Sequence, residues 1–166
     1  MTLDPKKRDG FEPRDAKFLD IIDRCGWHVM SVAPRVGEGG DVFSYSTGLF
    51  LRFNHPEIMV CGLDSNPSVA IINEIGRKVQ AGGTFGSDQS YSDIFADDVK
   101  CRFRPVQIAY YGEYVCWSQW FYEGTDFPVL QCFWPDRKGQ FPWENECHPE
   151  VVKAQPRLFL PPQSVM

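Results

Sequence analysis

The residues best suited to chemistry lie around a corner of the chain that reads Asn-His-Pro-Glu at positions 54–57. His55 and Glu57 stand on either side of a proline, so their side chains leave the backbone close to one another. A histidine beside a carboxylate can act as a general base near neutral pH, because the ordinary pKa of imidazole is about 6.5 and a neighbouring carboxylate stabilises its charged form. This corner is therefore the first candidate for a reactive site.

Further polar side chains lie on two segments before the corner. His28 belongs to the first alternating segment and Tyr45 and Thr47 to the second, and the two segments are predicted to pair as a hairpin. We expect these residues to share one water-accessible hollow with His55 and Glu57. In this hypothesis His28, His55 and Glu57 are catalytic, and Tyr45 and Thr47 bind the ligand.

The same residues also have a structural interpretation, which the sequence leaves open. His55 can satisfy the carbonyl groups of a turn, Glu57 can cap the corner, and His28 can form hydrogen bonds inside the core. A nucleophile is also missing, since Ser44 and Ser46 lack the Gly-x-Ser-x-Gly pattern. The sequence therefore does not decide whether the protein is an enzyme.

Metal and cofactor signatures are absent from the sequence. Six cysteines are spread singly through the chain without a Cys-x-x-Cys pair, and His28, His55 and His148 lack the spacing of zinc ligands. Neither a Walker loop nor a Gly-x-Gly-x-x-Gly pattern occurs. We therefore predict no metal site and assign no cofactor.

A basic stripe alternates with apolar residues over positions 99–106. Lys100, Arg102 and Arg104 share one face of the predicted strand. Charged residues of this kind protect the edges of sheets against aggregation, or they form a platform for an anion. Arg102 and Arg104 are accordingly candidate ligand-binding residues, with edge protection as the alternative.

The segment 108–122 is predicted to be a helix with an aromatic side. Tyr110, Tyr114, Trp117 and Phe121 recur at helical spacing. Large aromatic side chains at this spacing belong to a core in most proteins, but they can also stack on a flat ligand. Trp117 is the candidate ligand-binding residue on this segment.

The remaining elements are predicted from apolar periodicity and from glycine and proline. We expect helices over 13–25 and from 66 to the glycines at 82 and 83, and strands over 27–33, 42–47, 57–63, 99–106 and 128–134. The long loop from 83 to 98 is of the kind that often forms a lid. The expected fold is α+β, with a mainly antiparallel sheet, loosely like the split barrels that bind flavin, and about three flanking helices.

Length and composition indicate one domain. With 166 residues, 43% hydrophobic and 14% aromatic, the chain can bury a full core, and we assign an N-terminal extension to 1–12, the domain to 13–155 and a Pro-containing tail to 156–166. The net charge of −5 argues against a nucleic-acid partner, and no apolar stretch reaches the roughly twenty residues of a membrane span. Without a secretory signal and with unpaired cysteines, a cytoplasmic location is expected.

Several short motifs carry a resemblance to a known family. They are Gly26-Trp27-His28-Val29, Phe43-Ser44-Tyr45, Thr47-Gly48-Leu49, His55-Pro56-Glu57, Asn73-Glu74-Ile75-Gly76-Arg77, Arg102-Phe103-Arg104-Pro105-Val106, Tyr111-Gly112-Glu113-Tyr114, Phe127-Pro128-Val129-Leu130-Gln131, Trp134-Pro135-Asp136 and Phe141-Pro142-Trp143. In these motifs the chain resembles the uncharacterised, mainly bacterial domain of unknown function 4262 (DUF4262), over roughly 26–155. Ser46 departs from the threonine expected there, which keeps the hydroxyl.

The resemblance implies an architecture and no activity. From the residues, the first functional hypothesis is a small-ligand-binding domain or an enzyme with its site at the corner of His28, Tyr45, His55 and Glu57. The alternative is a protein-interaction module without catalysis, which forms a homodimer or binds a partner through exposed Trp and Tyr side chains.

Overall fold

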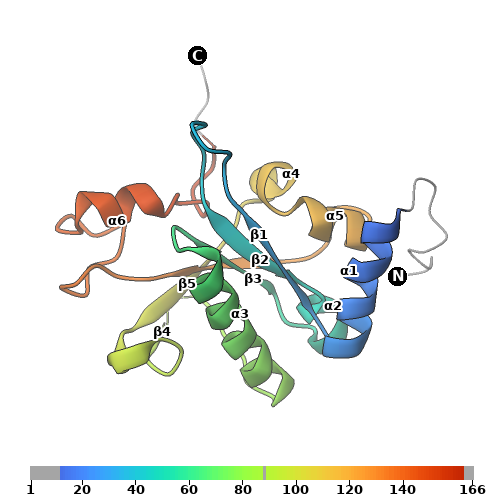
Figure 1. The fold of residues 1–166 in the computed structure, drawn as a ribbon. Helices are drawn as coiled ribbons and strands as arrows, with labels where there is room; N and C mark the ends of the chain where they lie inside the picture. Colours follow the sequence, from blue (N-terminus) through green and yellow to red (C-terminus); the bar gives the residue numbers. More distant parts are fainter. Residues whose placement is uncertain (1–11, 88, 163–166) are drawn as a thin grey trace.

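The computed structural model describes residues 12–87 and 89–162 of the chain. Its centre is a sheet of six strands in the order β1-β2-β3-β6-β5-β4 (Figure 1). The strands are β1 (His28–Val32), β2 (Phe43–Thr47), β3 (Glu57–Cys61), β4 (Ser90–Tyr91), β5 (Cys101–Pro105) and β6 (Val129–Phe133). The five strands expected from the sequence are present, and β4 is a short addition inside the long loop.

The sheet is mixed and open. β3 and β6 run parallel, whereas every other neighbouring pair is antiparallel. The prediction of an α+β fold with a mainly antiparallel sheet is therefore confirmed. The split-barrel analogy is wrong, because β1 and β4 remain at opposite ends of the strand order and the sheet does not close. The parallel pair needs a long crossover, and here that connection includes the long loop, β4, β5 and three α-helices.

Six α-helices lie in the described residues, instead of the three or so that the sequence suggested. They are α1 (Pro13–Cys25), α2 (Leu49–Phe53), α3 (Ser65–Gln80), α4 (Tyr111–Tyr114), α5 (Cys116–Tyr122) and α6 (Pro149–Ala154). The predicted helix over 108–122 is divided, because Val115 has φ −116° and ψ 49° and so leaves the helical region between α4 and α5. α2 and α6 are too short for an apolar period to reveal them.

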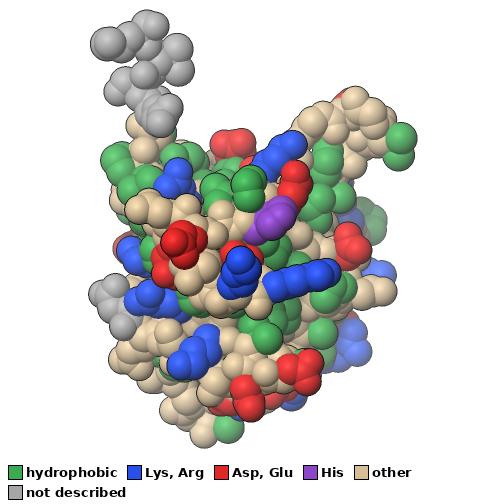
Figure 2. All heavy atoms as spheres, turned by 90° about the vertical axis from the view of Figure 1, so that its left-hand side faces the viewer, with side chains coloured by type: hydrophobic (Ala, Val, Ile, Leu, Met, Phe, Trp, Pro, Cys, Tyr) green, Lys and Arg blue, Asp and Glu red, His purple; other side chains and the backbone are tan. Residues whose placement is uncertain are grey.

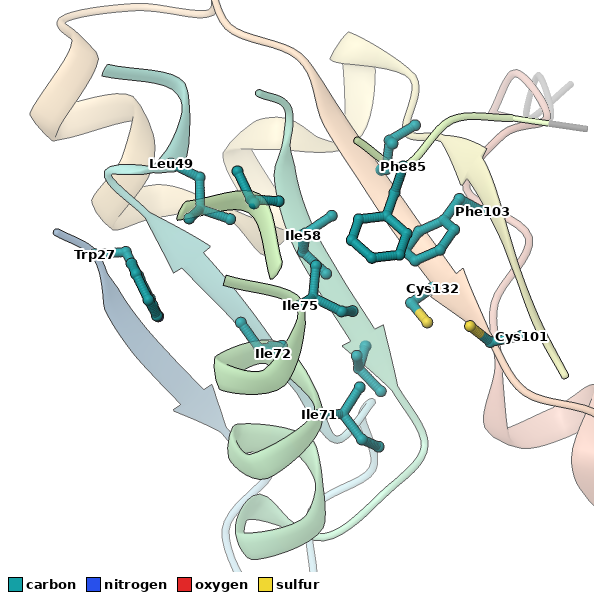
Figure 3. Packing of buried hydrophobic residues seen from close by; sticks show 13 residues of the cluster. Trp27, Leu49, Ile58, Ile71, Ile72, Ile75, Phe85, Cys101, Phe103 and Cys132 are labelled. Atoms are coloured by element: carbon teal, nitrogen blue, oxygen red, sulfur yellow. The ribbon is translucent and has the colours of Figure 1, made fainter. Parts of the chain in front are cut away.

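α3 covers one face of the sheet, and its apolar stripe packs there as predicted (Figure 3). Ile72 and Ile75 of α3 are fully buried, as are Ile58 and Val60 of β3 beneath them. Each such side chain contributes about 1.5–3 kcal/mol by leaving water. This core is closed and apolar.

The opposite face of the sheet is covered by α4 and α5 and is rich in aromatic rings. Tyr45, Tyr111 and Tyr114 are buried in it. α1 packs beside this layer, with Phe18 and Ile22 in one cluster with Phe121 of α5. The core interpretation of the aromatic helix therefore holds for Tyr114 and Phe121, which are both buried.

The loop between α3 and β5 is anchored to the body of the protein. Tyr91, Ile94 and Phe95 pack against the apolar core beneath α3, and β4 pairs with β5 through Ser90 opposite Arg102. Whether this loop acts as a lid stays a prediction.

Residues just outside the expected domain 13–155 make contacts with it at both ends. The proposed extension 1–12 lies outside the described residues except for Glu12, whose side chain takes part in a capping box at the start of α1. In the proposed tail, Leu158 is buried against the sheet. Within 12–87 and 89–162, no helix has both the length and the apolar character that crossing a membrane requires.

Gly76 of α3 allows the helix to lie directly on an indole ring. A Cβ at this position would come within 2.5 Å of the Trp27 ring, whose Nε1 donates a hydrogen bond to Asn73 Oδ1 (3.0 Å). We predict that Gly76→Ala lowers the free energy of unfolding by about 1–3 kcal/mol, although alanine is the better helix former. Chemical denaturation measures the change.

The matched control for this substitution is Gly112→Ala in α4. Its Cβ would meet no atom closer than 3.9 Å, so the substitution should be neutral or stabilising by up to about 1 kcal/mol. Equal effects of the two substitutions would contradict the close contact between α3 and Trp27.

Candidate functional site

The carboxylate of Glu57 lies at the predicted corner and is fully buried. It accepts hydrogen bonds from the Ser46 hydroxyl (2.8 Å) and from the backbone N–H groups of Gly48 (2.9 Å), Leu49 (3.2 Å) and Phe50 (3.2 Å). The Tyr122 hydroxyl of α5 donates a fifth, short hydrogen bond to it. Burial raises the pKa of Glu57, and these donors oppose the rise.

These contacts make Glu57 the N-terminal cap of α2. The next backbone N–H of the helix, that of Leu51, donates to the Tyr122 hydroxyl (3.2 Å), and Arg52 N begins the helical ladder by donating to Gly48 O. The first four N–H groups of a helix have no partner within it, and here Glu57 and Tyr122 satisfy all of them. A carboxylate with about four lone-pair sites and five donors has no free site for a substrate proton.

Gly48 makes this arrangement possible. Its φ is 122°, and a Cβ there would lie 2.6 Å from the carbonyl oxygen of Gly26. Only glycine adopts this conformation without strain, so the chain can turn from β2 into α2 directly above the carboxylate.

His55 is 4% exposed, and both of its ring nitrogens have partners. Nδ1 lies 2.9 Å from the carbonyl oxygen of Pro56, so it carries the proton and donates. Nε2 accepts a hydrogen bond from the backbone N–H of Phe85 (2.9 Å). The ring is therefore neutral, and burial lowers the pKa of His55. His55 joins the start of the long loop to the corner.

His28 lies on the other side of the sheet. It shares the face of Met30 on β1 and packs against Phe18 of α1, with the ring centroids 4.8 Å apart. Burial lowers the pKa of His28, and its Nδ1 is buried without a hydrogen-bond partner. His55 instead contacts Phe85, which belongs to the α3-side core. The expected hollow shared by the two histidines is not formed.

Tyr45 and Thr47 are on the same face as His28, but both are buried under α5. The Tyr45 hydroxyl accepts a hydrogen bond from the backbone N–H of Trp117 (3.1 Å), and Thr47 Oγ1 lies 2.7 Å from the Ser118 hydroxyl. Burial raises the pKa of Tyr45. The two side chains thus connect β2 to α5.

Trp117 is the one predicted residue of this group beside an open hollow. The hollow has a volume of about 270 Å³ and is lined also by Trp120, Cys116 and the start of α1, with the Arg14 guanidinium 5.9 Å from the Trp117 ring. Catalysis by His28, His55 and Glu57 stays a prediction, and none of the three residues lines this hollow.

Arg102 and Arg104 lie against an aromatic cluster that the sequence did not predict. The cluster consists of Phe133 of β6 and three residues of the C-terminal part, Phe141, Trp143 and Phe159. The Arg104 guanidinium carbon is 4.4 Å from the Trp143 ring centroid and 4.8 Å from that of Phe159. The Arg102 carbon is 5.5 Å from the same Trp143 ring.

The two arginines are half-buried and carry no counter-charge in the described part of the chain. None of the ion pairs formed there involves Arg102 or Arg104. The Nε atoms of both are buried without a hydrogen-bond partner. The rings stabilise each cation through the face of the π-system, typically by about 0.5–2 kcal/mol. Arg102 and Arg104 therefore converge on one indole ring.

The segment that carries the aromatic cluster is fixed to the sheet by side-chain amides. Gln155 forms two hydrogen bonds with the backbone of Trp134, at 3.0 and 2.8 Å. Gln131 Nε2 donates to Pro156 O (2.9 Å), and Gln107 Nε2 donates to Phe159 O (3.0 Å). The arginines at 102 and 104 and the Phe-Pro-Trp motif at 141–143 lie far apart in the sequence, and nothing there indicated their pairing or identified Gln131 as a partner of this segment.

A hollow of about 580 Å³ lies beside α6 and is lined by Asp136, Arg137, Lys138, Glu146, Cys147, His148, Pro149 and Val151. Its polar groups serve the local fold, since the Asp136 carboxylate accepts three backbone N–H groups and His148 Nδ1 accepts that of Glu150. Figure 2 shows the face at the left of Figure 1, where basic and acidic side chains are interspersed. No three His, Cys, Asp or Glu side chains of the described residues could jointly hold a metal ion.

The capping role of Glu57 can be tested by its effect on stability. We predict that Glu57→Gln lowers the free energy of unfolding by about 2 kcal/mol or more, because the amide N–H₂ faces donors, and that Glu57→Ala lowers it by about 3 kcal/mol or more. Glu74→Gln on the exposed side of α3 is the control and should change it by at most about 0.5 kcal/mol. A Glu57→Gln protein as stable as the wild type would support the catalytic assignment instead.

The neutral state of His55 predicts sensitivity to acid. Because the folded-state pKa lies below the ordinary value of about 6.5, the unfolded chain binds more protons, and stability falls as pH drops below that value by up to about 1.4 kcal/mol per pH unit. His55→Gln keeps an acceptor for the Phe85 N–H and should make this fall less steep, leaving the contribution of His28. Denaturation curves between pH 5 and 8 measure it, with the exposed His148→Asn as the control.

The contrary result for His55 is a pH profile that His55→Gln leaves unchanged. In that case the imidazole would not be held neutral by its bond to Phe85, and the acid sensitivity would arise elsewhere.

Comparison with known proteins identifies the family of this chain. No curated protein and no solved structure matches the chain. A family model described as a domain of unknown function (DUF4262) matches residues 21–148, which includes the corner, the arginine stripe and most of the aromatic cluster. The chain belongs to the DUF4262 family.

Proposed function

We propose that the protein binds a small anionic ligand through Arg102 and Arg104. The observation that carries the proposal is the pair of half-buried guanidinium groups at a single indole ring, without an ion pair to any acidic side chain of the described residues. Both residues lie on one face of β5, two positions apart.

The energetics favour an added anion at this place. Side chains two positions apart on a strand begin about 7 Å from each other, and two unit charges at that distance repel by about 2 kcal/mol at an effective dielectric of about 20. The aromatic rings offset part of this repulsion and do not remove it. An anion that contacts both groups converts the repulsion into attraction.

The geometry also supports a choice of ligand class. A guanidinium group presents a planar fork of donors that matches carboxylate and phosphate oxygens, and its contact with rings limits the orientations that the fork can take. The face of Trp143 is already engaged by Phe141, which stacks on it with centroids 5.2 Å apart. Recognition of a flat ring by stacking is therefore disfavoured there, and a compact oxyanion fits better.

Edge protection explains the same arginines less well. β5 is not an edge strand of the sheet, since β4 pairs with it and Ser87 forms a bridge with Phe103. The face of the two arginines is also covered by the aromatic cluster, whereas a protective charge needs open solvent. The alternative of a protein-interaction module or homodimer stays a prediction that no contact of the described residues favours over this one.

The proposal is tested by titrating the full chain with phosphate, sulfate and small carboxylates. Binding is measured by calorimetry or by the NMR signals of the arginine Nε–H groups. We expect binding to weaken by about tenfold or more in Arg102→Gln and in Arg104→Gln, because each loses a charge-assisted hydrogen bond of about 1.5–3 kcal/mol. Binding should also weaken as ionic strength rises.

The control variant is Arg35→Gln, which removes the same charge from the exposed loop between β1 and β2. It should leave binding unchanged. The proposal fails if the wild type binds none of these anions at millimolar concentration, or if Arg35→Gln weakens binding as much as the two β5 variants do.

A further inference from the structure

Gln131 of β6 is a buried amide with an unused oxygen. The side chain is 0% exposed, and in the antiparallel pair of β5 and β6 its Cα lies opposite that of Arg104. Its Nε2 donates to the carbonyl oxygen of Pro156 at 2.9 Å, which fixes the orientation of the amide because a carbonyl needs a donor. Oε1 is buried and has no hydrogen-bond partner.

Unused polar atoms gather around this residue. In the described part of the chain, four buried side-chain nitrogen or oxygen atoms lack a partner, namely His28 Nδ1, Arg102 Nε, Arg104 Nε and Gln131 Oε1. Three of them belong to neighbouring positions on one face of β5 and β6. Buried polar groups of folded proteins are paired in the great majority of cases, so a concentration of exceptions in one place calls for an explanation.

The three atoms define a hydrogen-bonding pattern. The two arginine Nε–H groups are donors, whereas the glutamine oxygen is an acceptor. A bare oxyanion would satisfy the donors but would bring its own lone pairs toward the glutamine oxygen. A group that carries both anionic oxygens and a hydroxyl satisfies all three atoms, since the hydroxyl can donate to Oε1.

We infer that Gln131 is a specificity-determining residue for an oxyanion that carries a hydroxyl on, or next to, its charged group. This inference rests on the proposed binding of an anion by Arg102 and Arg104. Two sources share this chemistry, hydrogen phosphate and a 2-hydroxycarboxylate. Sites that are built to pair with a substrate hydroxyl discriminate strongly against analogues without it, because the buried partner is then left unpaired.

Matched ligands separate this inference from the proposal beneath it. At mildly alkaline pH, hydrogen phosphate and sulfate are both tetrahedral dianions, but sulfate has no proton to donate. Lactate and propionate differ in the same way by one hydroxyl beside a carboxylate. Calorimetric titration of the full chain with these four anions identifies the preferred pair, and with it the source of the oxyanion.

The expected result is that the wild type prefers the hydroxyl-bearing member of one pair by about tenfold or more. Gln131→Met, which has a similar volume and no amide, should abolish that preference while it keeps the binding of the member without a hydroxyl. If Gln131→Met does not fold, Gln131→Asn, whose shorter side chain withdraws the amide, is expected to reduce the preference in the same way.

The outcomes against the inference are distinct. If the wild type binds both members of each pair equally, the role of Gln131 is overturned and the anion site remains. A water molecule that joins Gln131 Oε1 to Arg104 would produce this result. A preference that persists in the folded Gln131 variant overturns it as well. Absence of binding for all four anions means that the underlying proposal has failed.

Discussion

The hydrogen bonds of the buried Glu57 carboxylate join the end of β2, α2 and α5 to β3, and the arrangement of these elements depends on them. Moving a carboxylate out of water costs several kcal/mol, so it persists only where donors replace the lost hydration. Those donors come from the end of β2, from the first turn of α2 and from Tyr122 of α5. One side chain of β3 thereby fixes a turn, a helix and the layer above the sheet. The positive end of the helix dipole adds to the stabilisation.

The two faces of the sheet differ in how they use polar side chains. The α3 face is mainly apolar and is held chiefly by burial, with hydrogen bonds such as that from Trp27 to Asn73 beside the apolar cluster. The other face carries Thr47, Glu57 and Gln131 inside, with Arg102 and Arg104 at its β5 end. The first two are fully paired with neighbouring elements. The last three retain unpaired atoms, so the polar side chains of this face separate into a structural group and a group with unused hydrogen-bonding capacity.

Alternation and apolar period were sufficient to predict five of the six strands together with α1 and α3, because each of these depends on neighbours a few positions away. They failed where a partner lies far along the chain. One of the five donors to Glu57, Tyr122, stands 65 positions away, and Phe85, which donates to His55, stands 30 positions away. The break at Val115 depends in the same way on tertiary packing. Arg102 and Arg104 were visible as a stripe, but Phe159, which covers one of them, lies in a segment expected to be a tail.

The contrast between the histidine corner and the arginine stripe illustrates how a candidate site should be judged. Residue type made His55 and Glu57 attractive, yet each has its hydrogen-bonding capacity filled by the backbone around it. A group that is already saturated has little to offer a substrate, whatever its chemistry. Arg102 and Arg104 are less distinctive in sequence, but their Nε atoms have no hydrogen-bond partner and neither residue forms an ion pair with an acidic side chain of residues 12–87 or 89–162. The aromatic rings stabilise each of the two cations. The unused hydrogen-bonding capacity of their Nε atoms is the feature that the proposed anion would explain.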